Sequence, residues 1–234
     1  MTLHAAMVPI GELSAATRDD MFRLMEGYYL NVSRRQFASD LEQKDLAIVL
    51  TNDGQLHGFS TWMLRRHEFE GQPINVIFSG DTIIEREHWS SMALPMAWGH
   101  LMLDAFYREQ NTPLYWLLTS KGYKTFRFLP IFFKQFHPCP GTITPEFEKR
   151  LAQYLGTHKY GDRFDVERGL VRANGDAQRL RPGVADPDEA RLKDEFVNYF
   201  VQANPRAAEG DELLCLARCH PDNLKPFILR QLTR

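Results

Sequence analysis

Residues 46–84 decide the fold, and they read LAIVLTNDGQLHGFSTWMLRRHEFEGQPINVIFSGDTII. The continuous apolar run at 46–50 is typical of a central strand. The Asn-Asp-Gly sequence at 52–54 is a strong hairpin signal, because Asp-Gly accepts the positive φ of a tight turn. A second turn signal, Gly-Gln-Pro, separates an apolar run at 56–66 from another at 74–84. The stretch therefore predicts three long strands in an antiparallel meander.

Downstream of this meander the hydrophobic period changes from two residues to three or four. Apolar residues between Met92 and Phe106 fall on one helical face. Pro95 is tolerated in a first helical turn, so the helix is expected to begin at about residues 90–94. Residues 114–118 then form a short apolar run of the buried kind. A strand, a crossover helix and another strand predict one parallel pair joined right-handedly.

Weaker periodic signals lie on both sides of this central part. Capping residues indicate the starts of the N-terminal helices. The segment 122–136 is rich in aromatic residues and would be apolar on nearly every face of a helix. The further expected elements are a strand at 3–10, helices at 17–29, 33–43, 122–136, 145–155, 188–202 and 221–232, and strands at 169–173 and 211–217.

Length and composition restrict the class of protein. The 234 residues allow one large domain or two small ones. A net charge of −2 gives no support to a nucleic-acid binder. Cys139, Cys215 and Cys219 cannot all pair, which favours free thiols over a disulfide framework. No run approaches the ~18–20 apolar residues needed to span a bilayer, and no targeting signal is evident, so a cytoplasmic location is expected.

The order of these elements, with Ser79-Gly80-Asp81-Thr82-Ile83-Ile84 followed by a helix, resembles the GNAT acyl-CoA N-acyltransferases. The resemblance covers roughly residues 3–136. It implies an α/β fold with a mixed, mostly antiparallel, splayed sheet flanked by helices, and a cleft beside the fourth and fifth strands. Residues 1–137 would form the GNAT-like core, and residues 138–234 an extension of helices and strands that completes or covers it.

The resemblance also implies a function. The protein would move an acyl group from a CoA- or carrier-protein-linked thioester to an amine, with acyl-CoA or acyl-phosphopantetheine as co-substrate. Its partners would be a small-molecule acyl donor, an amine acceptor and, as a further candidate, an acyl carrier protein. The alternative is a non-catalytic binding or regulatory module. The aromatic helix expected at 122–136 would be core, with lining of a long acyl chain as its alternative role.

This sequence departs from the family in the loop after the fourth strand. Family members usually carry Arg/Gln-x-x-Gly-x-Gly/Ala there, and the backbone N–H groups of that loop hold the CoA pyrophosphate. Residues 85–93 read EREHWSSMA, so both glycines are missing. Ser90 and Ser91 are the candidate anion ligands in this turn, with plain helix capping as the alternative role.

The end of the next strand is a second candidate anion site. Residues 119–127 read TSKGYKTFR, which places a glycine and three cations at a helix start with no acid beside them in the sequence. A phosphate-bearing ligand is therefore expected mainly at this segment and secondarily at the 86–91 turn, although a solvated helix start is the plainer alternative. The candidate binding residues here are Ser120, Lys121, Gly122, Lys124 and Arg127.

Catalysis in this family needs a base for the amine and an acid for the leaving thiolate. Tyr123 is the candidate acid by position, since family members often place a Tyr near the helix after the fifth strand. Asp81, Glu85 and His88 are the candidate bases, and a surface role is the alternative for His88. The remaining histidines considered fit no metal or triad spacing, so no metal is expected; they are His57, His67 and His100.

Overall fold

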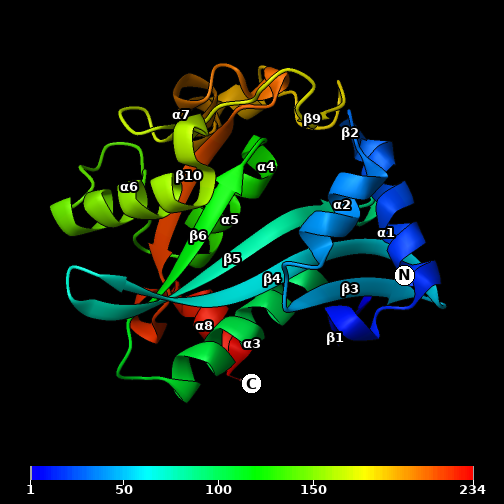
Figure 1. The fold of residues 1–234 in the computed structure, drawn as a ribbon, viewed down its shortest axis with the longest axis horizontal. Coiled ribbons are helices and arrows are strands. Elements are labelled where there is room, and N and C mark those ends of the chain that lie inside the picture. Colours follow the sequence, from blue (N-terminus) through cyan, green and yellow to red (C-terminus); the bar gives the residue numbers. More distant parts are fainter. Residues whose placement is uncertain (1, 234) are drawn as a thin grey trace.

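The computed structural model describes residues 2–233, and an eight-stranded sheet runs through them in the order β1-β3-β4-β5-β6-β10-β8-β7 (Figure 1). A separate two-stranded sheet pairs β2 (Tyr29–Leu30) with β9 (Arg179–Leu180). The strands of the large sheet are β1 (His4–Pro9), β3 (Leu46–Asn52), β4 (Gln55–Phe69), β5 (Gln72–Ile84), β6 (Leu114–Ser120), β7 (Phe164–Asp165), β8 (Leu170–Val171) and β10 (Glu212–Arg218).

Helices cover both faces of the large sheet. Alternate residues of a strand point to opposite faces, so Ile48 and Leu50 pack in the core beneath α3, whereas Ala47 and Val49 pack in the core beneath α1 and α2. Burial on both faces explains the continuous apolar run of β3. The helices are α1 (Ala15–Tyr28), α2 (Arg34–Leu41), α3 (Ala93–Arg108), α4 (Tyr123–Phe126), α5 (Phe128–Phe132), α6 (Glu146–Tyr160), α7 (Glu195–Ala203) and α8 (Pro226–Leu232). None of the helices within residues 2–233 has the length and apolar character to cross a membrane.

The mixed, mostly antiparallel sheet flanked by helices that was expected from the sequence is confirmed. The antiparallel meander consists of β3, β4 and β5, each pairing with the next. After the crossover through α3, β6 pairs parallel to β5. The strands expected at 211–217 and 169–173 are present as β10 and β8, and they extend the sheet beyond β6.

The prediction of a single helix at 122–136 is wrong. The segment forms two short helices, α4 and α5, and its helical conformation ends at Phe133, which is extended. Phe133 bridges to Leu224, and His137 bridges to Leu216 of β10, so pairing with the C-terminal part of the chain replaces helical hydrogen bonds. Core packing is nevertheless confirmed for most of the aromatic side chains, since Phe126, Phe132, Phe133 and Phe136 are at most 2% exposed.

Residues 174–191, which we call the strap, lie between β8 and α7 in the sequence. Their strand β9 pairs with β2 in the N-terminal part of the chain. In Figure 1 this part of the chain crosses from the side of β10 to β2, next to the end of α1. Beside the two residue pairs between β2 and β9, Arg181 donates its backbone N–H to Tyr28 O at 2.9 Å and its Nε to Glu26 O at 3.0 Å. The strap is therefore tied to the N-terminal half by a few hydrogen bonds.

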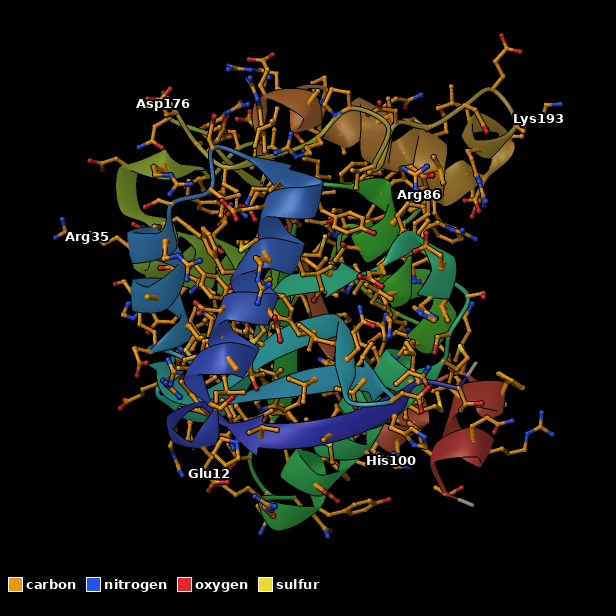
Figure 2. All side chains as sticks on the ribbon, turned by 90° about the vertical axis from the view of Figure 1, so that its right-hand side faces the viewer. Glu12, Arg35, Arg86, His100, Asp176 and Lys193 are labelled. Atoms are coloured by element: carbon orange, nitrogen blue, oxygen red, sulfur yellow. The ribbon has the colours of Figure 1, made fainter. Side chains whose placement is uncertain are left out.

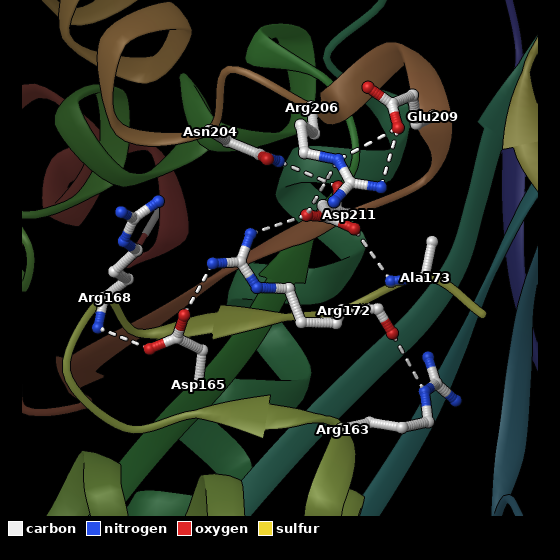
Figure 3. Close-up of polar contacts among 9 residues, drawn as sticks. All are labelled: Arg163, Asp165, Arg168, Arg172, Ala173, Asn204, Arg206, Glu209 and Asp211. Atoms are coloured by element: carbon white, nitrogen blue, oxygen red, sulfur yellow. Dashed lines mark hydrogen bonds and ion pairs between the residues drawn. The ribbon is translucent and has the colours of Figure 1, made fainter.

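A buried carboxylate holds the chain just before the strap (Figure 3). The Asp211 side chain is fully buried and accepts from Arg172 Nη1 and from the Ala173 N–H, both at 2.8 Å. Arg172 also pairs with Asp165 at 2.5 Å, and the Asp211 carbonyl accepts from Asn204 Nδ2 at 2.8 Å. These contacts join the β7–β8 hairpin to the start of β10.

Replacing Asp211 by Ala is expected to lower the free energy of unfolding by roughly 1.5–3 kcal/mol, because charge-assisted hydrogen bonds are lost in a buried site. Urea denaturation at pH 7 measures this change. Glu209→Ala is the matched control: its ion pair with Arg206 is more than half exposed, so a change within about 0.5 kcal/mol is expected. Equal losses in both variants would contradict the anchoring role of Asp211.

Candidate functional site

The parallel ladder between β5 and β6 stops long before β5 does. Its last registered pair is Phe78 with Leu117, whereas β5 continues to Ile84. Beyond that pair the strands separate, and a cleft of about 1320 Å³ lies between them. The cleft is also lined by α2, by the ends of α1 and α6, and by the strap.

Two tryptophans fill the point where the strands separate. The Ser79 hydroxyl accepts from Trp116 Nε1 at 2.6 Å and from Trp98 Nε1 at 3.3 Å. The two indole rings lie with their centroids 4.3 Å apart, in the core beneath α3. Because Ser79 is bonded to these side chains directly after the last ladder pair, the apex of the cleft has a fixed shape.

The cleft brings together most of the residues predicted from the sequence. Ser120 lies outside the lining, where its buried hydroxyl donates to Gly122 O at 2.7 Å. Glu85 and His88 also lie outside it, at the far end of β5. The predicted residues that line the cleft are Asp81, Ser90, Ser91, Lys121, Gly122, Tyr123, Lys124 and Arg127.

Asp81 lies in an irregular part of the β4–β5 ladder. The register shifts between the pairs Thr61–Gly80 and Phe59–Ile83, which leaves an extra residue on β5, and Asp81 has a φ of 45°. Such bulges bend a strand and redirect a side chain. Burial raises the pKa of the Asp81 carboxyl, and the nearby Lys44 and Lys121 partly oppose this effect. A carboxylate with a raised pKa in a cleft suits a general base.

A second group of polar side chains lies on the α6 side of the cleft. The Lys159 ammonium lies 3.8 Å from the centroid of the Phe78 ring, and burial, followed by repulsion from Lys44, lowers its pKa to about 8. The Tyr160 and Thr119 hydroxyls are 3.1 Å apart. Sequence analysis missed this group, because α6 and β6 are joined here only by tertiary packing.

The expectation of three cations without a nearby acid is wrong for two of them. Lys121 pairs with Glu212 at 2.7 Å, and Arg127 pairs with Asp194 at 3.3 Å. Both acids come from the C-terminal part of the chain. The space beside Gly122 is filled as well, since a Cβ added there would lie 2.9 Å from the side chains of Leu180 and Ala185.

Lys124 forms no ion pair within residues 2–233, and it belongs to a cation cluster that we define as Arg86, Lys124 and Arg191, of which Arg86 and Lys124 lie over the Trp89 ring. Lys124 Nζ lies 3.1 Å from the Trp89 ring centroid and donates to Val184 O at 2.5 Å. Burial, followed by repulsion from Arg86 and Arg191, lowers the pKa of Lys124 to about 8, and attraction to Asp186 partly opposes this effect.

Arg86 brings the second charge to this cluster. Its guanidinium lies 5.2 Å from the Trp89 ring centroid and donates to Gly183 O of the strap at 3.1 Å. Figure 2 shows Arg86 beneath the chain between Asp176 and Lys193. Neither Arg86 nor Lys124 forms an ion pair within residues 2–233, so their positive charge is available to an anion.

The start of α3 offers few donors to an anion. Its N-cap, Met92, makes no side-chain capping bond, and Ala93 donates its N–H to Ser91 Oγ at 3.2 Å. Pro95 has no N–H at all. The backbone N–H groups of two of the first three helical positions are therefore unavailable to an anion. In this respect the start of α3 differs from the glycine-rich loops that bind phosphate at a helix N-terminus.

The chain matches no model of a known protein family and no curated protein. Among solved structures it is similar to a protein from Enterococcus faecalis described as a probable N-acyltransferase, with 14% identity and a TM-score of 0.43, over 56% of this chain and 33% of that one. It is also similar to an acyl-CoA N-acyltransferase from Pseudomonas aeruginosa, with 15% identity and a TM-score of 0.35, over 50% of this chain and 80% of that one. An N-acyl amino acid synthase from uncultured soil microbes has 16% identity and a TM-score of 0.35, over 56% of this chain and 78% of that one. The match thus spans about one third of the length of the first protein.

Replacing Asp81 by Asn is expected to stabilise the protein at pH 7. A raised pKa means that the folded chain holds this proton more tightly than the unfolded chain, so ionisation costs the wild type stability as the pH rises above 3.8, the ordinary value. The difference in the free energy of unfolding between variant and wild type should therefore grow from pH 4 to pH 7.

Asp53→Asn is the control for this comparison, because Asp53 also has a positive φ, 49°, but is exposed in a hairpin turn. If both variants change stability equally across the pH range, backbone conformation rather than burial of the Asp81 carboxyl is responsible.

Proposed function

We propose that this protein is an acyltransferase that moves an acyl group from a CoA- or carrier-protein-linked thioester to an amine. One observation carries the proposal: the β5–β6 ladder ends at Phe78 and Leu117, and the cleft that opens there contains a carboxylate of raised pKa, Asp81. Tyr123, from the segment after β6, is the candidate acid in the same cleft.

The separated strands are the proposed donor site. Asn75 donates its N–H to Pro113 O, in the direction of β6. The two-residue period of a strand directs the N–H of Ser79 the same way, where it completes the last ladder pair, so a β5 N–H beyond Ser79 would face the gap left by β6. A thioester carbonyl between the strands would accept from such an N–H, which would stabilise the negative charge that develops on its oxygen during attack.

The proposed reaction needs two proton transfers. Asp81 accepts a proton from the amine as its nitrogen attacks the thioester carbonyl carbon. The C–S bond then breaks, and the Tyr123 hydroxyl donates its proton to the departing thiolate. The products are an amide and a free thiol, and proton exchange with water restores both side chains.

The cation cluster is the proposed phosphate site. Arg86 and Lys124 have only carbonyl oxygens and the Trp89 ring as partners within residues 2–233, whereas Lys121 and Arg127 are each paired with a carboxylate. The diphosphate of CoA, or the phosphate of a phosphopantetheine arm, would therefore bind at Arg86 and Lys124 rather than at Lys121 and Arg127.

A small recess favours a short acyl group. It measures about 20 Å³ and opens between α3 and the separated strands, with Trp98, Trp116 and Phe132 among its lining residues. Ser79 and Leu118 line both the recess and the main cleft. A methyl-sized group fits this volume, so an acetyl thioester is the proposed first donor to examine.

A non-catalytic binding module is the second candidate, and the start of α3 favours it. The donors that a glycine-rich loop would supply are reduced there, because Ala93 already bonds to Ser91 and Pro95 has no N–H. Such a module would bind an acyl thioester without releasing its thiol.

Thiol release from acetyl-CoA in the presence of a panel of amines distinguishes the two functions. For an acyltransferase, Asp81→Asn should lower the rate by about 10²–10⁴-fold, the usual contribution of a general base, and leave acetyl-CoA affinity nearly unchanged. Asp53→Asn should retain the full rate. Binding without thiol release in the wild type would favour the module, and absence of binding to any thioester would refute both.

The phosphate site is tested by comparing two double variants in acetyl-CoA titrations at low salt. Arg86→Ala with Lys124→Ala should weaken binding about tenfold or more, since a charge-assisted contact contributes roughly 1.5–3 kcal/mol. Lys121→Ala with Arg127→Ala removes the same formal charge and should change affinity less. The reverse ranking would place the phosphate at the paired cations, and the proposed site would be wrong.

A further inference from the structure

We propose that His57, Glu85 and His88 form a binding site for a divalent transition-metal ion, with Zn²⁺ as the best match. One ligand atom from each of the three residues lies within 4.8 Å of the others. None of the three residues lines the cleft, so this site is separate from the proposed acyl-transfer chemistry.

Sheet pairing brings the three residues together. Gly58 of β4 pairs with Ile84 of β5, which places His57 and Glu85 side by side at the ends of neighbouring strands. Glu85 donates its backbone N–H to His57 O at 2.8 Å, and His88 donates its own to Glu85 O at 2.9 Å. The backbone of all three residues is thus already held in place, so a metal ion would not have to order it.

The side chains already converge. His57 Nδ1 lies 2.7 Å from Glu85 Oε2, and the rings of His57 and His88 meet edge to face with centroids 4.7 Å apart. Zn²⁺ bonds of about 2.0–2.2 Å separate neighbouring ligand atoms by about 3.3 Å in tetrahedral geometry. Small side-chain rotations would produce that spacing from the observed one without moving the backbone.

The donor set selects the type of ion. Two imidazole nitrogens and one carboxylate oxygen suit Zn²⁺, with water completing the fourth position, whereas Mg²⁺ and Ca²⁺ prefer oxygen ligands. The His57 side chain is 14% exposed and the Glu85 side chain 31% exposed, which leaves a path for an ion and its water.

A bound ion would fix the beginning of the turn that forms one wall of the cleft. Trp89 follows His88 directly, donates Nε1 to Ile84 O at 2.8 Å, and forms the surface on which Lys124 lies. Metal binding would therefore hold Trp89 and the cation cluster in position, a structural rather than a catalytic role.

Zinc titration by calorimetry, on the untagged full chain after treatment with a chelator, tests the proposal. One Zn²⁺ per chain is expected for the wild type, and Mg²⁺ should not compete. His88→Ala leaves the His57–Glu85 contact intact and should weaken Zn²⁺ binding by more than about tenfold, since loss of even an outer-shell partner costs about 10–100-fold. Zn²⁺ should also raise the Tm of the wild type and not that of His88→Ala.

Two control variants examine other histidines. His100 is exposed on α3, and His158 lies beside His67 with ring centroids 5.4 Å apart. His100→Ala and His158→Ala should both bind Zn²⁺ as the wild type does. Unchanged binding in His88→Ala, loss of binding in His158→Ala, or absence of binding in the wild type would each overturn the assignment. Because no acyl donor is used, the result is independent of the proposed acyltransferase function.

Discussion

The early end of the β5–β6 ladder is the constraint on which the rest of this structure depends. Two features enforce it. The bulge at Asp81 bends β5, and the bonds from Trp98 and Trp116 to Ser79 fill the apex with two large rings. Parallel strands that separate expose backbone groups that need new partners. Polar side chains, helix starts and the strap line the gap that results.

Most of the fold could be predicted from the sequence, because local patterns encode it. The Asn-Asp-Gly turn and the period-two runs predict the meander, and the change to a helical period after Ile84 predicts the crossover to β6. The break after Phe132 could not be predicted in this way. It depends on pairing with Leu216 and Leu224, which lie far along the chain.

The candidate site was only partly predictable, and the reason is again distance along the chain. Asp81 lies near the end of a predicted strand and Lys124 at a predicted helix start, so local patterns point to them. The carboxylates of Asp194 and Glu212, which neutralise Arg127 and Lys121, come from elements that no local pattern connects with the cleft. His57 likewise lies beside Glu85 because of the register between β4 and β5. The spacing of these two residues in the sequence does not indicate that contact.

The weak attachment of the strap has a consequence for the rate at which a bound molecule would exchange. Two residue pairs and a few further hydrogen bonds attach it to the N-terminal half, whereas the strands beneath it are paired over much longer stretches. Segments with so few attachments open at a free energy far below that of global unfolding. The residence time of any molecule enclosed under the strap would then follow the frequency of this local opening, so that affinity and exchange rate can vary independently.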